Sequence, residues 1–516
     1  MEPFIGNDKS EEVINNPKRN AVENDIVAYV NYLYEIHGFD YMCKFIRNKG
    51  FTVSTPSHFK STSFENRLIM IKYLDNSKLW QPLWTRQCRG VILYLNNSDK
   101  WICLKYQLPR GAEVLTGLHL KSGIEETENI SIKNFEILDD VQKDTIKRLL
   151  DGAPIEGVMS FKSDGTLMGV SMYSNKYYDL IDMFVTNYGS ELSKIIVSMS
   201  KDIGLPFIPV LNSQATYFLN RDMEEFMITS ILSETINDDK LKELAKIYSP
   251  SQLFEKYGTG FMCQLGIFYD KFMESYSAKL NGLDIITLNF ETRCRKRKTA
   301  WGKVHSELTI SYERSGLKIL GLSYGDEKIG FLAHFQIDDI INYADFEEPL
   351  WWKISHSNDI ESIMMDLTEC IRNIKSEDSK SKFLDKHKPS NKYQSRNIIF
   401  DYEGFVFYRE TENGLDYSKI KTEEYYKSHK FRKNNIDYLF KLNQVAGDIF
   451  PLSKIVKEFF TDFEGKLKSI CDDALNLLKE SEEHNILFNQ LSDRAKASYS
   501  KQNNDTKMKI LINASG

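Results

Sequence analysis

The chain has 516 residues, of which 41% are apolar and 27% charged, and its formal net charge is −6. This composition is typical of a soluble globular protein of two or three domains and excludes a largely disordered chain. No apolar run reaches 18 residues, and the polar start MEPFIGNDKSEEVINN does not resemble a secretory signal, so neither a membrane span nor secretion is expected. Because the total charge is acidic, a nucleic-acid partner would have to be bound by local basic patches.

The cysteines point to a reducing compartment. There are seven of them, an odd number, and they are scattered without any CxxC spacing: Cys43, Cys88, Cys103, Cys263, Cys294, Cys370 and Cys471. This pattern predicts neither a disulfide framework nor a structural zinc site. The expected location is therefore intracellular, in the cytoplasm or the nucleus. A GxxxxGK[ST] phosphate loop is also missing from the sequence, which argues against a fused P-loop kinase domain.

The first half of the chain changes from helical to strand-like patterns. Residues 1–60 form a predicted N-terminal extension, with a helix where apolar residues recur at intervals of three and four in DIVAYVNYLYEIHGFDYMCKFI. From about residue 65, β-branched and aromatic runs bounded by Asn, Asp, Gly and Ser predict strands. These runs are RLIMIKYL, RGVILYL, KWICLKY, GVMSFKS and TLMGVSMY. The stretch from about 190 to 280 is mostly helical in pattern, and strands return at LDIITLNFE, SELTISYE and LKILGLSY.

The second half ends in a helical pattern. Residues 375–396 are polar and highly charged and predict an exposed loop or linker. NIIFDYEGFVFYRE and DYSKIKTEEYY then predict a strand pair, and from about 432 apolar residues recur at helix spacing. We therefore predict an α+β protein with antiparallel sheets in a domain at 61–435 and a helical insertion at about 190–280. The N-terminal extension, 1–60, precedes this domain, and an all-helical domain, 436–516, follows it.

One short segment, SFKSDGTLMGV at 160–170, places Lys162 among apolar neighbours, followed by Asp164 and Gly165. A lysine amine attacks only when it is unprotonated, and burial among apolar groups or cationic neighbours favours that form. A lysine followed by a carboxylate and a glycine fits a covalent lysyl–nucleotide mechanism. By itself the pattern is weak, since a solvated lysine in a turn would look the same.

Further polar residues accompany Lys162 in order along the chain. They are Arg89 in RQCRGVILY, Glu291 in ITLNFETRC, Glu403 in DYEGFVFYR, and Lys419 and Lys421 in YSKIKTEEYY. Transfer of a nucleotide needs a nucleophile, cations on the phosphate oxygens, and carboxylates that bind a ribose hydroxyl and a hydrated Mg²⁺. Lys162, the three cations and the two glutamates supply these groups as a set, although each has an ordinary structural explanation alone.

A basic cluster follows Glu291 in the segment RCRKRK. It comprises Arg293, Arg295, Lys296, Arg297 and Lys298. The cluster is either a solvated loop or a surface that contacts RNA phosphates, where each cation adds a salt-dependent increment to binding.

The order of these motifs resembles the covalent nucleotidyltransferase superfamily of ATP-dependent ligases and mRNA capping enzymes. Within it, the chain is similar to the phage RNA ligase 1-like family in three places. CRGVILY resembles its upstream Arg-Gly strand, the nucleophile motif continues as Gly-Thr-Leu, and KIKTEEYYKSH resembles its final motif, with Tyr425 and His429 after the lysine pair. FVTNYGSEL resembles the strand after the nucleophile, but Asn187 and Tyr188 precede Gly189 and Ser190, where the family has a lysine.

The resemblance implies a nucleotidyltransferase (adenylation) core and a role for each motif residue. Lys162 would take AMP from ATP, and Glu291 would bind the ribose. Glu403 would orient Mg²⁺ (or Mn²⁺) and help to deprotonate the lysine, while Asp164 would arrange the water shell of the metal. The remaining residues would contact phosphate: Lys419 and Lys421 on the α-phosphate and pyrophosphate side, and Arg89 during transfer to RNA.

The implied activity is that of an ATP-dependent RNA ligase. It would join 5′-phosphate and 3′-hydroxyl RNA ends through lysyl-AMP and adenylylated RNA, in the repair of RNA such as a nicked tRNA. Residues expected to contact the RNA are Arg293, Arg295, Lys296, Arg297, Tyr425 and His429. Separate end-healing kinase and phosphatase enzymes are conceivable partners. Two alternatives stay open, a GTP-dependent RNA guanylyltransferase and a catalytically inactive RNA-binding protein on the same fold.

Overall fold

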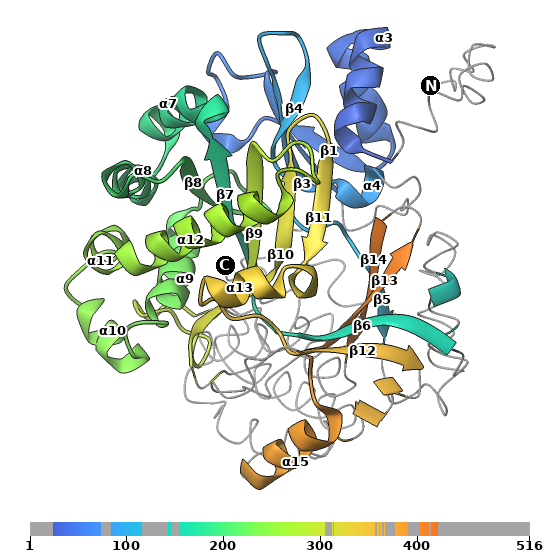
Figure 1. Ribbon diagram of the computed structural model, residues 1–516. Coiled ribbons are helices and arrows are strands. Elements are labelled where there is room, and N and C mark those ends of the chain that lie inside the picture. The colour runs from blue at the N-terminus through green and yellow to red at the C-terminus, as the bar shows by residue number, and fades with distance from the viewer. Residues whose placement is uncertain are drawn as a thin grey trace, which may run out of the picture. The chain divides into compact units, whose positions relative to one another are not determined.

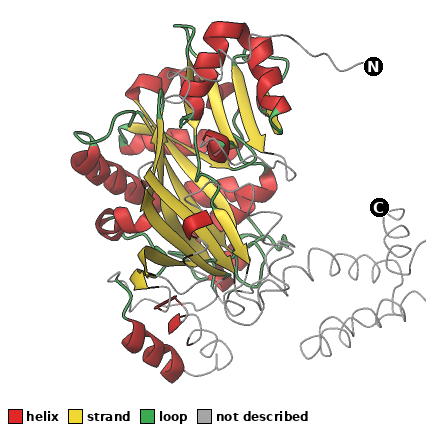
Figure 2. Ribbon diagram, turned by 90° about the vertical axis from the view of Figure 1, so that its right-hand side faces the viewer, coloured by secondary structure: helices red, strands yellow, loops and turns green. Residues whose placement is uncertain are grey.

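The computed structural model describes residues 24–73, 84–115, 143–145, 148, 154–304, 312, 314–356, 359–360, 362–363, 366, 377–390, 403–411 and 414–421, all within the unit Met1–Glu423. The predicted C-terminal helical domain, 436–516, lies outside the described residues, as do Tyr425 and His429. So does most of the strand predicted at SELTISYE. Within the described residues the α+β prediction is confirmed, because helices surround three largely antiparallel sheets (Figures 1 and 2).

The first sheet is formed by strands from the N-terminal part of the chain. Its order is β1 (Phe51–Ser54), β2 (Leu68–Tyr73), β3 (Arg89–Leu95) and β4 (Trp101–Lys105), all antiparallel. Helix α3 (Ile26–Asn48) begins where the Asp25 carboxylate accepts from the amides of Val27 and Ala28, at 2.7 and 3.2 Å. The apolar face of α3 and the short helix α4 (Trp84–Gln87) pack on this sheet in one core. Strand β1 lies before the boundary expected at residue 60, yet it pairs with β2 after that boundary.

The second sheet has the order β11 (Ile329–Ala333), β10 (Gly316–Gly325), β9 (Ile285–Arg293), β7 (Thr166–Ser174) and β8 (Phe207–Ser213). All its pairs are antiparallel. Most of the described helices belong to the connections of this sheet, and in Figure 1 they lie along one side of it. They are α7 (Tyr178–Tyr188), α8 (Glu191–Ile203), α9 (Arg221–Leu232), α10 (Asp238–Leu244), α11 (Pro250–Tyr257), α12 (Thr259–Tyr276) and α13 (Asp338–Tyr343). The apolar faces of all these helices except α7 share the largest core of the described residues with the strands, whereas the buried residues of α7 pack in a second core with Tyr173 of β7.

The third sheet has the order β12 (Trp351–His356), β6 (Pro154–Lys162), β13 (Gly404–Thr411), β14 (Gly414–Lys421) and β5 (Ala112–Leu115). Its pairs are antiparallel except the last, because β14 and β5 run parallel. The turn Ser163-Asp164-Gly165 carries the chain directly from β6 in this sheet to β7 in the second sheet. Lys162 therefore lies where the second and third sheets meet.

Three segments differ from the sequence predictions. The stretch at 190–280 is mainly helical, as expected, but it also contains β8, a strand of the second sheet. FVTNYGSEL is not a strand: Ile181, Phe184 and Val185 are buried at helical spacing in α7, and Ser190 caps α8. The predicted linker at 375–396 contains helix α15 (Glu377–His387). Phe383 of this helix is buried, and its ring packs edge-on against that of Trp352, with 6.2 Å between the ring centroids.

Two chemical expectations can be compared with the described residues. The five cysteines among them are free thiols: Cys43, Cys88, Cys103, Cys263 and Cys294. In the described part of the chain, no helix combines the length and apolar character needed to cross a lipid bilayer.

Candidate active site

A cavity of about 530 Å³ opens where the three sheets meet. The first sheet contributes Lys72, Tyr73 and Arg89 to its wall, and the second contributes Leu167, Glu291, Leu320 and Phe331. From the third sheet come Ser160, Lys162, Val406, Tyr408, Tyr417 and Lys419. The volume lies within the range of cavities that hold a nucleotide-sized molecule. Four of the predicted site residues, Arg89, Lys162, Glu291 and Lys419, therefore line one cavity although up to 330 positions separate them in the sequence.

Lys162 and Glu403 form the centre of the site. The two residues meet because β6 and β13 pair with Lys162 opposite Gly404, and the Glu403 amide donates to the Lys162 carbonyl oxygen at 2.7 Å. The Lys162 ammonium donates a short hydrogen bond to the Glu403 carboxylate. Only 18% of the Lys162 side chain and 6% of the Glu403 side chain are exposed, so this ion pair is largely shielded from water.

The protonation state of Lys162 differs from the sequence-based expectation. Burial by itself lowers the pKa of the ammonium, but the charges of Glu403, Glu291 and Asp164 and the hydrogen bond to Glu403 outweigh it and raise the pKa above its usual value of 10.5. The free protein therefore holds an ammonium at this position. Its proton must leave before the lysine can act as a nucleophile, and Glu403 is the group in contact with it.

Gly165 provides space for Glu291. A Cβ atom at this glycine would lie 2.6 Å from the carbonyl oxygen of Thr292 and 2.7 Å from Cγ of Glu291. The residue at position 165 thus has to be small so that strand β9 can bring the Glu291 carboxylate to the cavity. Burial raises the pKa of Glu291 to about 7, with Glu403 and Asp164 adding to the rise and Lys162 and Arg89 opposing it.

The cavity also has a positively charged wall. Arg89 and Lys72 are direct partners on β3 and β2, and neither side chain has an ion-pair partner among the described residues. Burial lowers the pKa of Lys72. Lys419, half-buried on β14, reaches the same cavity, whereas Lys421 is described only as the backbone partner of Gly404. Three cations that line the same cavity create a positive potential suited to phosphate groups.

A buried lysine fixes one rim of the cavity. Lys105 is fully buried, and its ammonium donates to the carbonyl oxygens of Ser213 and Thr216 at 2.5 and 3.1 Å. This holds the turn at 213–216, whose Gln214 lines the cavity. Gly90, with φ +83°, permits the turn to approach, because a Cβ atom there would lie 1.9 Å from the Gln214 carbonyl oxygen. The Gly of the Arg-Gly pair is thus required by packing.

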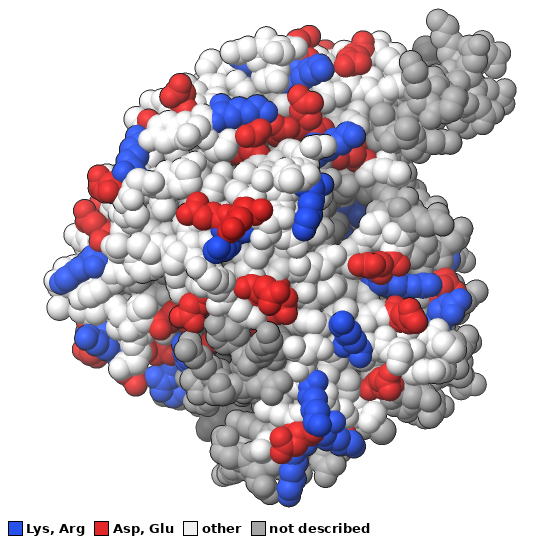
Figure 3. All heavy atoms as spheres, viewed as in Figure 1, with Lys and Arg blue, Asp and Glu red and all other residues white. Residues whose placement is uncertain are grey.

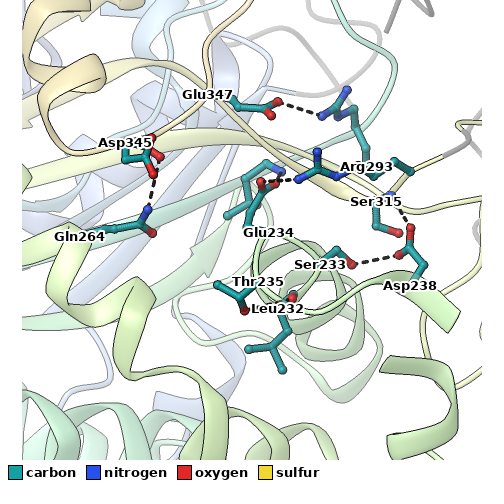
Figure 4. A network of polar contacts seen from close by, with 12 residues as sticks. Leu232, Ser233, Glu234, Thr235, Asp238, Gln264, Arg293, Ser315, Asp345 and Glu347 are labelled. Carbon is teal, nitrogen blue, oxygen red and sulfur yellow. Dashed lines mark hydrogen bonds and ion pairs between the residues drawn. The ribbon is translucent and has the colours of Figure 1, made fainter. Parts of the chain in front are cut away.

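A polar network ties the helices to the strand that carries Glu291 (Figure 4). Glu234, after α9, accepts from the amide of Leu317 at 3.0 Å and pairs with Arg314 at 3.1 Å. Asp238, at the start of α10, accepts from the Ser233 hydroxyl and the Ser315 amide, both at 3.0 Å. These contacts anchor the start of β10, the neighbour of β9, and so help to position Glu291.

The basic cluster at 293–298 does not form a single surface. Arg293 is buried, and its guanidinium faces Glu347 at 3.5 Å and the ring of Tyr312. Only 3% of the Arg293 side chain is exposed, whereas a contact with RNA needs an accessible cation, and the predicted contact itself stays untested. Arg295 is partly exposed and pairs with Asp239 at 2.8 Å. Over the face seen in Figure 3, basic and acidic side chains are interspersed.

The other members of the cluster have different surroundings. Lys296 and Lys298 are exposed, and neither has an ion-pair partner among the described residues. Arg297 is half-buried: burial lowers the pKa of its guanidinium, while the nearby Asp164 carboxylate raises it. Arg297 therefore lies near the turn after Lys162. Tyr312 is close to the same turn, because its hydroxyl accepts from the Asp164 amide at 2.7 Å.

The sequence analysis missed several residues of the cavity. Lys72 lies within the predicted strand RLIMIKYL, and only its pairing opposite Arg89 places it in the site. Ser160, two residues before Lys162, was not distinguished from an ordinary strand residue. Ser160 contacts the buried His334, which in turn contacts the buried Glu348. Both lie far along the chain from Ser160, and no local sequence pattern indicates them.

The carboxylates near Lys162 fit a metal that arrives with a substrate. Among the described residues, no group of three or more His, Cys, Asp or Glu side chains is arranged to hold a metal alone. Mg²⁺ is commonly bound by one or two carboxylates together with substrate phosphates. Asp164 and Glu403 both lie close enough to Lys162 to raise the pKa of its ammonium, so a phosphate at Lys162 would complete such a set.

Comparisons with known proteins add little. No family model matches the chain, and no curated protein matches it. Two solved structures, forms 2 and 1 of an archaeal ATP-dependent RNA ligase, are similar to it at 10% sequence identity. The first match covers 95% of this chain and 84% of the other with a TM-score of 0.34, and the second covers 88% and 76% with a TM-score of 0.32. TM-scores this low do not establish a shared fold, so what the site can do follows from its own residues.

Proposed function

We propose that the protein is an ATP-dependent RNA ligase that forms a covalent lysyl-AMP at Lys162. The observation that carries this proposal is the cavity itself, in which a shielded lysine contacts a carboxylate and three further cations line the same space. Lys162 and Glu403 are the nucleophile and the group that accepts its proton. Lys72, Arg89 and Lys419 are the cations proposed to contact the phosphates, and Glu291 is the group proposed to bind a ribose hydroxyl, since all four line the cavity.

The first step requires removal of a proton from the Lys162 ammonium. Glu403 accepts this proton, and the Lys162 amine then attacks the α-phosphorus of ATP. A nitrogen–phosphorus bond forms as the bond between the α-phosphorus and the bridging oxygen breaks, and pyrophosphate leaves. Bound Mg²⁺ would offset negative charge on the phosphates, held by Asp164 and Glu403. Lys72, Arg89 and Lys419, which line the same cavity, would stabilise the same charge.

The second and third steps transfer AMP and seal the RNA. A 5′-phosphate oxygen of the RNA attacks the phosphorus of lysyl-AMP, which gives adenylylated RNA and returns Lys162. A 3′-hydroxyl then attacks the RNA 5′-phosphorus and AMP leaves. The exposed Lys296 and Lys298 and the half-buried Arg297, near Asp164, are suited to contact the RNA backbone. Tyr425, His429 and Lys421 keep their proposed roles from the resemblance, as do repair of nicked RNA and an end-healing partner.

The test is covalent labelling of the purified protein. Incubation with Mg²⁺ and ATP labelled in its α-phosphate should give a labelled protein on a denaturing gel, and α-labelled GTP should give none. Lys162→Ala should abolish the label, whereas Lys194→Ala, at an exposed lysine on α8, should keep it. The labelled protein should then join 5′-phosphorylated single-stranded RNA to a 3′-hydroxyl end. Labelling from GTP alone would indicate a guanylyltransferase instead. Labelling that persists in Lys162→Ala would refute Lys162 as the nucleophile.

A further inference from the structure

The turn at 295–298, just after strand β9, has a backbone that residues other than glycine rarely adopt. Lys296 and Arg297 have φ values of +49° and +58°, in the left-handed region. The Lys298 amide donates to the Arg295 carbonyl oxygen at 3.0 Å and closes a turn of the kind in which Asn-Gly is the usual central pair. Two long cationic side chains stand in that place here. Backbone strain of this kind persists only where the surroundings hold it, and it gathers at functional sites.

Neighbouring segments hold this turn and tie it to the proposed nucleophile. The Arg295 amide donates to the Ser315 hydroxyl at 2.7 Å. The Lys296 amide donates to the carbonyl oxygen of Tyr312 at 2.9 Å. Tyr312 is fully buried, and its hydroxyl accepts from the amide of Asp164 at 2.7 Å. One tyrosine thus connects the strained turn with the turn that follows the nucleophilic lysine.

The three cations at 296–298 have different surroundings. Lys296 and Lys298 are exposed, whereas Arg297 is half-buried. Burial lowers the pKa of the Arg297 guanidinium, and the nearby Asp164 carboxylate opposes that change. The described lining of the cavity does not include Arg297. This guanidinium therefore lies close to the reaction centre but outside the space that ATP would occupy.

The second step of the proposed reaction brings a new anion to the reaction centre. A terminal 5′-phosphate of the RNA has to reach the phosphorus that Lys162 carries. Three carboxyl groups lie close to that lysine, those of Asp164, Glu291 and Glu403. A phosphate monoester with a charge of about −1.5 to −2 is repelled by carboxylates unless further cations accompany it. A guanidinium suits this task, because its planar donors match two phosphate oxygens at once.

We infer that Arg297 binds the terminal 5′-phosphate of the RNA, while the exposed Lys296 and Lys298 bind phosphates within the RNA chain. The strain of the turn then has a reason, because this backbone places the half-buried cation beside the reaction centre and leaves its two neighbours in solvent. The inference rests on the proposed ligase function and deepens it, since it assigns the residue that distinguishes a 5′-phosphate end from a 5′-hydroxyl end.

Arg297 holds the attacking group and takes no part in the bond changes themselves. An oxygen of the 5′-phosphate forms a bond to the phosphorus of lysyl-AMP, and the phosphorus–nitrogen bond to Lys162 breaks. The nitrogen keeps the electron pair of that bond and takes a proton from Glu403, the group that accepted one in the first step. The products are adenylylated RNA and the free lysine.

The experiment measures binding of two RNA strands of one sequence, one with a 5′-phosphate and one with a 5′-hydroxyl. Fluorescence anisotropy is followed without ATP, with a dye on the 3′ end that also blocks sealing. The wild type should bind the 5′-phosphate strand at least about tenfold more tightly, as expected for hydrogen bonds between charged groups. In Arg297→Gly this ratio should fall close to one. Glycine favours the φ of this position, so the variant should be at least as stable as the wild type in thermal unfolding.

Lys296→Gly is the matched control. It relieves the same kind of backbone strain and removes an exposed cation, but it leaves Arg297 in place. Both strands should therefore bind more weakly by a similar factor, and the ratio of the two affinities should stay at the wild-type value. An equal loss of the ratio in Lys296→Gly would make the preference a property of the local charge and would overturn the role of Arg297.

A second readout follows transfer of AMP from isolated lysyl-AMP protein to the 5′-phosphate strand in a single turnover. Because the protein is already adenylylated, this rate does not depend on the first step. Arg297→Gly should slow the transfer at least about tenfold, in line with the lost contact. Lys194→Ala, at an exposed lysine of α8, should transfer AMP at the wild-type rate.

Failure of the inference and of the proposed function can be told apart. If the wild type is labelled from ATP but binds both strands equally, or if Arg297→Gly keeps the preference, the role of Arg297 is refuted while the ligase proposal stands. If no nucleotide labels the wild type, the proposed function fails, and the affinity ratios alone decide the inference. A preference for the 5′-phosphate that is lost only in Arg297→Gly would then support the site, and equal affinities would overturn it.

Discussion

At the scale of single residues, the candidate site depends on one glycine whose role is steric. Gly165 follows the acidic residue of the Lys-x-Asp-Gly motif, and a glycine there is readily explained by close approach of a phosphate. The structure provides a different reason, because the Glu291 side chain and the Thr292 carbonyl oxygen occupy the space that a Cβ atom would need. The motif and the strand β9 are therefore linked by packing, although 126 positions separate the two residues.

Gly165→Ala should therefore damage the site. The added methyl group would push Glu291 and β9 away, with a loss of about 1–3 kcal/mol in the free energy of unfolding, as for other overpacked sites. Lysyl labelling from ATP should fall strongly. The matched control is Gly260→Ala in α12, where a Cβ atom would meet nothing within 4 Å. This substitution should stabilise the protein by roughly 0.5–1 kcal/mol, because alanine favours the helix more than glycine does. Denaturant unfolding and labelling of both variants provide the comparison, and a fully active, stable Gly165→Ala would contradict the packing argument.

A second residue-scale prediction concerns Glu291 and pH. Burial raises the pKa of this carboxyl from 4.5 to about 7 in the folded protein, so between these pH values the folded state binds more protons than the unfolded state. Its contribution to stability is therefore greatest at low pH and is lost as the pH rises through about 7. The loss amounts to at most about 3 kcal/mol by the size of the shift. Glu291→Gln cannot titrate, so its free energy of unfolding should fall less than that of the wild type between pH 5 and pH 8.

The control for this measurement is Glu243→Gln. Glu243 lies on α10, is exposed and pairs with Lys246 on the surface. Its substitution should leave the pH dependence of unfolding as it is in the wild type. Parallel pH curves for Glu291→Gln and the wild type would mean that Glu291 is ionised in the folded protein throughout this range.

At the scale of elements, a buried ion pair fixes β14 against the first sheet. Arg86 of α4 pairs with Asp416 of β14, and 6% and 7% of the two side chains are exposed. Arg86 also donates from Nε to the carbonyl oxygen of Arg110 at 2.9 Å. Since β14 carries Lys419 three residues later, this pair helps to bring the lysine to the cavity.

Arg86→Ala should destabilise the protein by about 3–5 kcal/mol, because it removes the guanidinium that offsets the buried charge of Asp416. The exposed pair of Lys246 and Glu243 is the comparison, and Lys246→Ala should cost less than about 1 kcal/mol. Chemical unfolding of the three proteins measures the difference. A cost for Arg86→Ala as small as that for Lys246→Ala would show that β14 is held by its strand neighbours alone.

At the scale of the whole molecule, the net charge of −6 implies that the proposed RNA substrate would have to be bound by local basic residues. The structure divides the basic cluster that the sequence suggested for this purpose. Arg293 is buried and Arg295 is paired with Asp239, whereas Lys296 and Lys298 are exposed without ion-pair partners among the described residues. The exposed lysines are thus the members best placed to contact RNA phosphates.

Replacing Lys296 and Lys298 together by alanine should weaken binding of a 5′-phosphorylated single-stranded RNA and flatten its salt dependence. The slope of log K against log salt concentration should decrease by about 1.4, or ~0.7 for each lost phosphate contact. Fluorescence anisotropy titrations over a range of KCl concentrations provide this slope. The double variant Lys44→Ala and Lys194→Ala, at exposed lysines of α3 and α8, is the control and should keep the wild-type slope. If both double variants behave alike, the segment after Glu291 is a solvated loop.

The sequence by itself determined much of the local structure and was enough to propose Lys162 as the nucleophile. The strands at RGVILYL and TLMGVSMY, the helix that begins at Ile26 and the strand pair around Glu403 follow from side-chain periodicity and from the residues at their ends, which act over a few positions. Lys162 was found because a lysine, a carboxylate and a glycine are neighbours in the chain. In α7, Ile181, Phe184 and Val185 recur at helical spacing, although the overlapping segment FVTNYGSEL resembles a strand motif.

Only the tertiary structure decided which side chains share the cavity and how they are charged. Strand register places Glu403 beside Lys162, 241 positions away, and the resulting field keeps the lysine protonated in the free protein. Long-range packing also brings His334 to Ser160 and buries Arg293 in the interior. The physical reason is that burial and electrostatic fields depend on every nearby group in space, whereas local sequence patterns report only on neighbours along the chain.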